Sequence, residues 1–232
     1  MTGRKRGAIG GIDLPLVAVP LGFVVGNVAA AIVVSIVVAF VGSGTAASLA
    51  GSVGLWVGFI GVPIAVVRRC GSSMPEGLSL TSRPLLDALV GVPLGVALQV
   101  GVVPALYWVL EQWTGPVDVD EAARLLTEDA RGLWWVGVVA IVGIGAPIAE
   151  EIYFRGLILR SVGQRLGAPA GVLISSVLFA GSHFQLVQFP GLLVAGLSFA
   201  VLAIRSDRLG LAIACHAGFN LAAVAGLIIG TS

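Results

Sequence analysis

Three groups of polar residues interrupt apolar stretches in the second half of the chain, and their side chains could carry out hydrolysis. The groups are Glu150 and Glu151 with Arg155, Phe179 with His183, and His216 with Asn220. The chain has only two histidines, and both lie in these groups. A carboxylate and an imidazole can activate water, while a second imidazole and a carboxamide can donate hydrogen bonds to an oxyanion. The residue types therefore indicate a hydrolytic centre.

The first group contains two carboxylates with different surroundings. On a helix, the side chains of Glu150 and Glu151 point about 100° apart. Glu151 precedes Arg155 by four residues, which is the order that favours an ion pair. We interpret that pair as two buried charges that neutralise each other in support of the site. Glu150 has no such neighbour, and an unpaired carboxylate in apolar surroundings suits a general base or acid.

The other two groups each have a spacing of four residues, which places both members on one helix face. Phe179 is expected to pack against His183 and limit its rotation, with ordinary core packing as the alternative. For His216 and Asn220 the alternative is a hydrogen-bonded pair that only holds helices together. At 1.5 Å per residue from the cytoplasmic helix ends, Glu150, His183 and His216 lie roughly 15, 20 and 10 Å deep. Three helices could therefore bring these groups together.

A metal centre is a second chemistry for the same residues. Glu150, His183 and His216 could bind a divalent metal such as zinc and leave a position open for water. The sequence does not decide between this cofactor and none. The chain lacks the HExxH and GxSxG patterns and has no aspartate at mid-membrane depth. These absences argue against the zincin, rhomboid-like serine and aspartyl types of intramembrane protease.

The composition is that of a protein embedded in lipid. Hydrophobic residues make up 57% of the 232 residues and charged residues only 11%, whereas a soluble domain has about 25% charged residues. Ionisable groups inside a membrane are costly, so the three polar groups are interpreted as functional. The net charge is +1 and no basic patch is present, which argues against a nucleic-acid partner. The expected partner is the lipid bilayer.

Seven apolar segments reach or approach the roughly 20 residues that a membrane span needs. They cover residues 14–41, 49–67, 85–110, 133–159, 170–187, 191–204 and 209–229. Splitting the fourth at the glutamate pair would add an eighth span, and the short sixth could extend upstream through Pro190. Pro147, with Gly143 and Gly145, predicts a bent and loosened turn beside Glu150. The expected fold is an all-α polytopic bundle of seven or eight helices.

Small residues four apart predict close helix packing. Such pairs are Gly22 and Gly26, Gly54 and Gly58, and Gly91 and Gly95.

The distribution of positive charge predicts a cytoplasmic N-terminus. With that orientation, eleven of the thirteen lysines and arginines fall at cytoplasmic ends of spans, as the positive-inside rule requires. These are Arg4, Lys5, Arg6, Arg68, Arg69, Arg83, Arg155, Arg160, Arg165, Arg205 and Arg208. The acidic loop of residues 111–131, which includes Glu128, then lies outside. Asp118 with Glu121 predicts the start of a short surface helix in this loop. A plasma or inner membrane is the expected location.

The three groups, in this order, resemble the motifs of the CPBP (CAAX protease and bacteriocin-processing, or Abi) family of intramembrane proteases. Its pattern is EExxxR, FxxxH and HxxxN, which here reads Glu150-Glu151-x-x-x-Arg155, Phe179-x-x-x-His183 and His216-x-x-x-Asn220. The resemblance covers roughly residues 132–229, so these residues are expected to form the catalytic membrane domain. Residues 1–131 would supply the N-terminal transmembrane helices and the outer loop, within one membrane unit.

The resemblance implies roles for each motif residue. Glu150 would act with His183 to activate water, and His216 with Asn220 would stabilise the oxyanion. Glu151, Arg155 and Phe179 would support the site. The implied activity is an intramembrane endopeptidase that cuts membrane-associated proteins or peptides, either metal-dependent or of glutamate type. A non-catalytic scaffold or bacteriocin-immunity protein and a small-solute transporter are the alternatives. The transporter is disfavoured because no inverted repeat is found.

Overall fold

The computed structural model describes residues 12–127 and 129–230, and every regular element within these ranges is a helix. The all-α prediction is therefore confirmed. The elements are α1 (Ala18–Val41), α2 (Thr45–Phe59), α3 (Gly61–Arg69), α4 (Met74–Leu78), α5 (Pro84–Ala97), η1 (Leu98–Val102), α6 (Val103–Thr114), α7 (Glu121–Leu126), α8 (Leu133–Val138), η2 (Val139–Gly145), α9 (Ala146–Glu151), η3 (Ile152–Ile158), α10 (Leu159–Leu166), α11 (Ala168–Gly181), α12 (Phe189–Ser206) and α13 (Leu209–Gly230). The three η elements are π-helical.

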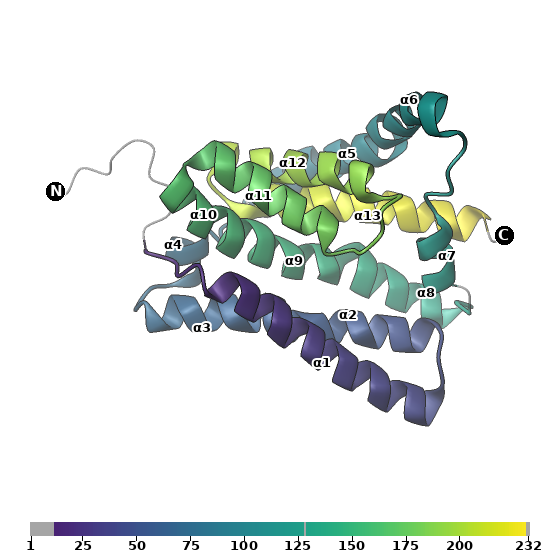
Figure 1. Cartoon of the computed structure of the whole chain (residues 1–232), viewed down its shortest axis with the longest axis horizontal. Helices are drawn as coiled ribbons and strands as arrows, with labels where there is room; N and C mark the ends of the chain where they lie inside the picture. The colour runs from purple at the N-terminus through teal and green to yellow at the C-terminus, as the bar shows by residue number, and fades with distance from the viewer. Residues whose placement is uncertain (1–11, 128, 231–232) are drawn as a thin grey trace.

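Successive elements join into long apolar helices that lie roughly side by side (Figure 1). Among the described residues, six helices are long and apolar enough to cross a membrane. They are Ala18–Val41, Thr45–Arg69, Pro84–Thr114, Leu133–Leu166, Phe189–Ser206 and Leu209–Gly230. The shorter apolar helix α11 corresponds to the remaining predicted segment. The fourth span is continuous over 34 residues, so the glutamate pair does not split it into two.

The fifth predicted segment is shorter than expected, because α11 ends at Gly181 instead of continuing to Val187. The carbonyl oxygen of Phe179 accepts hydrogen bonds from the Ser182 hydroxyl at 2.8 Å and from His183 Nδ1 at 2.9 Å. Side chains thus satisfy a carbonyl that a helix end leaves free. The chain turns through residues 182–188, and α12 begins at Phe189 with Pro190 in its first turn.

Two of the π-helical segments lie directly before a proline. Segment η1 precedes α6, whose second residue is Pro104, and η2 precedes α9, whose second residue is Pro147. Proline lacks an amide hydrogen and its ring clashes with the carbonyl four residues earlier. The wider π-helical turn accommodates this clash without breaking the helix. The loosened turn predicted beside Glu150 is therefore present as η2.

Several spans begin or end at the same end of the bundle, and arginines lie near these helix ends. Arg165 Nη2 pairs with Asp13 Oδ1 at 2.9 Å, which ties the end of α10 to the first described residues. The Leu209 amide, at the start of α13, donates to Ser79 O at 3.0 Å, just after α4. Figure 1 shows α3, α4 and α10 at this end, on the left. The arginine-rich ends thus lie together at one end of the bundle.

Some charges counted in that prediction lie elsewhere. Arg155 does not lie at a helix end, because it is completely buried within η3. Arg4, Lys5, Arg6 and Glu128 lie outside the described residues.

The helix predicted to start at Asp118 begins at Glu121 as α7. Asp118 instead forms an ion pair with Arg124 and accepts a hydrogen bond from the Asp120 amide at 3.2 Å. Its carboxylate therefore closes the turn before α7 and also interacts with the backbone of Glu121, the first residue of that helix.

Glycines allow the helices to approach closely, as predicted. A methyl group added at Gly58 would collide with the backbone of Gly22 and Gly26, across the contact between α2 and α1. A methyl group added at Gly95 would collide with the backbone of Cys215 and would lie 2.6 Å from the Phe219 amide nitrogen, across the contact between α5 and α13. Gly95 thus joins the third span to the helix that carries His216.

Replacing Gly95 with alanine is expected to lower the free energy of unfolding by about 1–3 kcal/mol, the usual effect of overpacking. Gly101 in η1 is the matched control, because no atom lies within 4 Å of an added methyl group there. Gly101→Ala should change stability by no more than about 1 kcal/mol. Both values can be measured by thermal unfolding in detergent micelles. Equal stability of the two variants would contradict the packing argument.

Candidate active site

The two adjacent glutamates occupy different environments, as expected from their orientation. Both lie on α9, between η2 and η3. The Glu151 side chain is completely buried, whereas the Glu150 side chain is 19% exposed. Glu150 is thus the more exposed of the two carboxylates, and Glu151 belongs to the interior.

Glu151 is held by two partners through one oxygen. Arg155 Nη1 donates to Glu151 Oε1 at 2.7 Å, and His216 Nδ1 lies 3.0 Å from the same oxygen. Arg155 is also completely buried. Its Nη2 donates to Gly196 O at 2.8 Å, and its Cζ lies 4.6 Å from the centre of the Phe179 ring. The predicted ion pair is therefore present, and its hydrogen bonds link the fourth span to α12 and α13.

His216 connects the two glutamates. Because Glu151 accepts from Arg155 as a carboxylate, the hydrogen in its contact with His216 belongs to Nδ1 of the imidazole. In the neutral ring, Nε2 then carries a lone pair, and it lies 3.8 Å from Glu150 Oε2. Phe199 stacks on the imidazole with ring centres 4.4 Å apart and planes 18° apart. The orientation of His216 is thus fixed by an acceptor on its edge and a ring on its face.

His183 is oriented in a similar way by Phe179. Its Nδ1 lies 2.9 Å from Phe179 O, and a carbonyl oxygen can only accept, so Nδ1 is the donor. The edge of one ring meets the face of the other, with centres 5.0 Å apart. Phe179 also lies edge-on to His216 at 5.4 Å. The phenylalanine therefore contacts both imidazoles, and the expected contact with His183 is confirmed.

Asn220 lies one turn beyond His216 on α13 and contacts η2. Its Nδ2 donates to Val142 O at 2.8 Å. In a π-helix, each carbonyl oxygen accepts from the backbone nitrogen five residues later. For Val142 that nitrogen belongs to Pro147, which has no hydrogen to donate. The carbonyl is therefore available to the carboxamide. This bond uses one of the two amide hydrogens of Asn220 and leaves the other for a further acceptor.

Helix α12 contributes two residues that the sequence did not reveal. Phe199 stacks on His216, and the carbonyl of Gly196 accepts from Arg155. A methyl group at Gly196 would lie 3.1 Å from the Phe179 ring and 3.4 Å from Arg155 Nη2. Gly196 and Phe199 are three residues apart and so lie on one face of α12. Neither glycine nor phenylalanine indicates a catalytic role by its residue type.

The side chains do not form a ligand set for a metal ion. Within residues 12–127 and 129–230, no three histidine, cysteine, aspartate or glutamate side chains form a group that could hold one. Nδ1 of each imidazole is hydrogen-bonded, to Glu151 in His216 and to Phe179 O in His183, which leaves Nε2 of each ring for another partner. No hydrogen bond or ion pair joins Glu150 to His183 in this part of the chain. Glu150, His183 and His216, the residues predicted to hold a metal if one is used, are therefore not gathered into one ligand group among the described residues.

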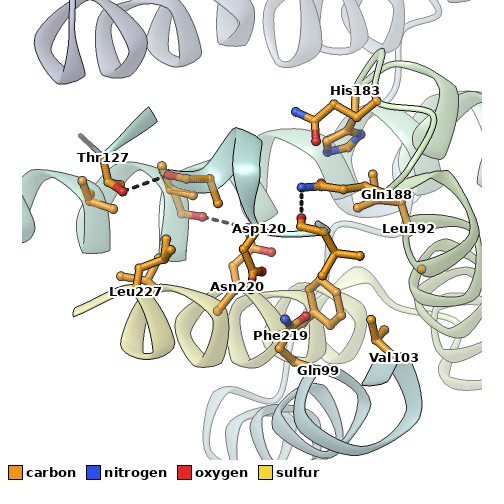
Figure 2. A pocket seen from close by; sticks show the side chains of 18 of the residues that line it. Gln99, Val103, Asp120, Thr127, His183, Gln188, Leu192, Phe219, Asn220 and Leu227 are labelled. Atoms are coloured by element: carbon orange, nitrogen blue, oxygen red, sulfur yellow. Dashed lines mark hydrogen bonds between the residues drawn. The ribbon is translucent and has the colours of Figure 1, made fainter. Parts of the chain in front are cut away.

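A cavity of about 260 Å³ adjoins the site. His183 and Asn220 line it from different elements, as Figure 2 shows. Its other lining residues include Gln99, Tyr107, Gln185 and Gln188, and Asp120 and Thr127 from the segment that contains α7. The cavity therefore opens from the motif residues towards α7, at the end of the bundle away from α4 (Figure 1).

A comparison with known protein families supports the motif analysis. Residues 132–222 match a family model described as Rce1-like, type II CAAX prenyl endopeptidase Rce1-like. The match confirms the resemblance to the CPBP and CAAX proteases, and it begins where the predicted catalytic domain begins. It supports a membrane protease function. No match was found among curated proteins or among solved structures.

Proposed function

We propose, from this likeness of residues 132–222 to CAAX endopeptidases, that the chain is an intramembrane endopeptidase. It hydrolyses peptide bonds of membrane-associated proteins or peptides with a water molecule that glutamate and histidine activate. The observation that carries the proposal is the convergence of the three motifs. Glu150 and Glu151 both face His216, and Phe179 contacts both His216 and His183.

Glu150 is the proposed general base. It is the more exposed of the two glutamates, and unlike Glu151 it has no ion pair with an arginine among the described residues. His183 assists by accepting a hydrogen bond from the attacking water at Nε2, because its Nδ1 hydrogen is committed to Phe179. The water loses one proton to Glu150 as its oxygen bonds to the carbonyl carbon. Glu150 then gives that proton to the departing amine as the carbon–nitrogen bond breaks.

Asn220 and His216 stabilise the negative oxygen of the tetrahedral intermediate. Asn220 donates through the amide hydrogen that Val142 does not use. His216 donates through Nε2 when both of its ring nitrogens are protonated, since Nδ1 is held by Glu151. Donors placed in advance at a developing oxyanion are a large source of rate enhancement. Glu151, Arg155 and Phe179 are positioning residues in this proposal, because they act through the imidazoles.

The proposed chemistry uses no metal ion, because Glu150, His183 and His216 are not gathered into one ligand group among the described residues. The protein lies in a plasma or inner membrane with its N-terminus in the cytoplasm. The clustering of arginine-rich helix ends supports this orientation. The cavity beside His183 then opens towards the opposite side of the membrane.

The test is cleavage of a library of quenched fluorescent peptides by the purified protein in detergent. Cleavage by the wild type is expected, and a chelator of divalent metals should leave the rate unchanged. Loss of activity with the chelator, and its return on adding zinc, would replace the metal-free mechanism with a metal-dependent one. Absence of cleavage across the library would favour a non-catalytic scaffold or immunity protein.

A further inference from the structure

A glutamine of the third span lines the same cavity as the motif residues. Gln99 lies in the middle of the span Pro84–Thr114, within the π-helical segment η1. Between Asp87 and Tyr107 it is the only residue of the span whose side chain has hydrogen-bonding groups. Polar side chains inside a membrane are costly and mark functional sites, and π-helical turns are frequent at such sites. Gln99 is therefore a candidate functional residue outside the segment that matches the protease family.

The carboxamide of Gln99 is accessible, and no described residue pairs with it. The side chain is half-buried, and neither its oxygen nor its nitrogen forms a hydrogen bond within this part of the chain. Both atoms keep accessible surface, in contrast to the unpaired oxygens Gln185 Oε1 and Glu151 Oε2, which are fully buried. A carboxamide in apolar surroundings needs partners to replace the water that it has lost. The open carboxamide therefore indicates a ligand with hydrogen-bonding groups of its own.

Gln99 belongs to the side of η1 that faces the cavity. It lines the cavity together with His183 and Asn220, and Figure 2 shows Gln99 and His183 on opposite sides of it. The neighbouring residues Val100 and Val102 are 63% and 48% exposed, so valines cover the outward face of η1. A ligand in the cavity therefore lies between Gln99 and the proposed reacting groups.

The size and lining of the cavity suit a short stretch of peptide. Its volume of about 260 Å³ exceeds that of a cavity of about 150 Å³ that holds benzene. Leu192, Phe219 and Leu227 provide apolar walls for a side chain. An extended peptide also presents main-chain N–H and C=O groups at regular intervals. A carboxamide matches these groups, because it has both a donor and an acceptor.

Another glutamine of this chain makes such a pairing. Gln164 Nε2 donates to Ile12 O at 2.6 Å, and Gln164 Oε1 accepts from the Leu14 amide at 3.1 Å. One carboxamide thus holds two main-chain groups of a segment without regular secondary structure. Gln99 has the same two groups, and both are open.

We propose that the cavity binds the peptide substrate in an extended form and that the Gln99 carboxamide pairs with its main chain. Oε1 accepts from one N–H, and Nε2 donates to one C=O. The inference rests on the proposed protease function, because it places the peptide between Gln99 and His183. Gln99 is then a determinant of substrate affinity, whereas Glu150 carries out the chemical step.

The experiment replaces main-chain amides of a peptide with esters, one at a time, on a protein that does not cleave it. An ester removes one N–H donor without adding bulk. The parent peptide is the one that the wild type cleaves best or, if none is cleaved, the library peptide that Glu150→Gln binds most tightly. Affinities are measured for Glu150→Gln alone and combined with Gln99→Met, which keeps the length of the side chain. Glu150→Gln with Gln112→Met is the matched control, since Gln112 is exposed on α6 of the same span and bonds Trp108 O.

One ester position should bind about tenfold more weakly to Glu150→Gln, the usual effect of leaving an acceptor unpaired. With Gln99→Met, that ester and the parent peptide should bind equally, and with Gln112→Met the full loss should remain. A loss that persists with Gln99→Met, or no loss at any position, would overturn the inference, as would the absence of any peptide binding to Glu150→Gln. In each of these cases, cleavage by the wild type would leave the proposed function standing.

Steady-state kinetics give a second readout. In the protein with Glu150 intact, Gln99→Met should raise KM about tenfold and leave kcat unchanged, because the bonds are made equally to the substrate and to the transition state. A fall in kcat at unchanged KM would contradict the inference, because Gln99 would then act on the transition state.

Discussion

Glu150→Gln is expected to lower kcat for peptide cleavage by about 10²–10⁴-fold, the contribution of a general base. Glutamine keeps the size of the side chain but cannot take a proton from water. The protein should remain folded, because the Glu150 side chain is 19% exposed and makes only a long polar contact among the described residues. That contact joins its Oε2 to His216 Nε2 at 3.8 Å. The measurement is the initial rate of cleavage of a quenched peptide, with thermal unfolding recorded on the same preparation.

Glu111→Gln provides the control for this result. Glu111 lies near the end of α6, far from the motif residues in sequence, and its Oε1 accepts from the Val117 amide at 3.2 Å. Glutamine can keep that bond, so both kcat and stability should be close to those of the wild type. A Glu150→Gln protein that retained more than about a tenth of the wild-type kcat would show that another group serves as the base.

Arg155→Met should have the largest effect on stability, lowering the free energy of unfolding by about 3–5 kcal/mol. Arg155 and Glu151 are both completely buried, and removing the guanidinium leaves the Glu151 carboxylate without its main neutralising partner. An unpaired charge is far more costly in a buried position than at the surface. Methionine retains much of the volume, so the loss reports the charge and its hydrogen bonds more than a cavity.

Combining Arg155→Met with Glu151→Gln tests this explanation. Removing both charges should recover a large part of the lost stability, because no uncompensated ion remains. Thermal unfolding of the wild type, both single variants and the double variant gives the coupling between the two sites. If Arg155→Met folded as stably as the wild type but cleaved no peptide, Arg155 would belong to the reacting groups and not to the supporting ones.

The sequence predicted the helical architecture well, because long apolar stretches have few alternatives in a membrane. The predicted second span of residues 49–67 corresponds to Thr45–Arg69, and the last, residues 209–229, to Leu209–Gly230. The end of α11 was missed because apolar character continues to Val187. Its end depends on hydrogen bonds from Ser182 and His183 to Phe179 O, which hydropathy does not report.

Within the site, contacts along one helix were easier to predict than contacts between helices. The four-residue spacings indicated the ion pair of Glu151 with Arg155 and the contact of Phe179 with His183. The bond from His216 to Glu151 and the stacking of Phe199 depend on how helices far apart in sequence cross. The path of the turn between α11 and α12 depends on bonds from Tyr107 to Val187 O and from Gln188 to Val119 O. No local pattern encodes either arrangement.

The π-helical segments affect how the fourth span can change during evolution. A shift of one residue rotates the rest of a helix by about 100°, and η2 is a place where such a shift is absorbed. Upstream of Glu150, Gly145 packs against Trp56 of α2 and Gly143 against Leu221 of α13. Downstream, η3 carries Arg155 in the interior. Helix α2 contacts the span both in η2, where Gly145 meets Trp56, and after it, where Tyr153 stacks on Phe59. A change of one residue in η2 can therefore alter the helical register before it while α9 and η3 keep their packing.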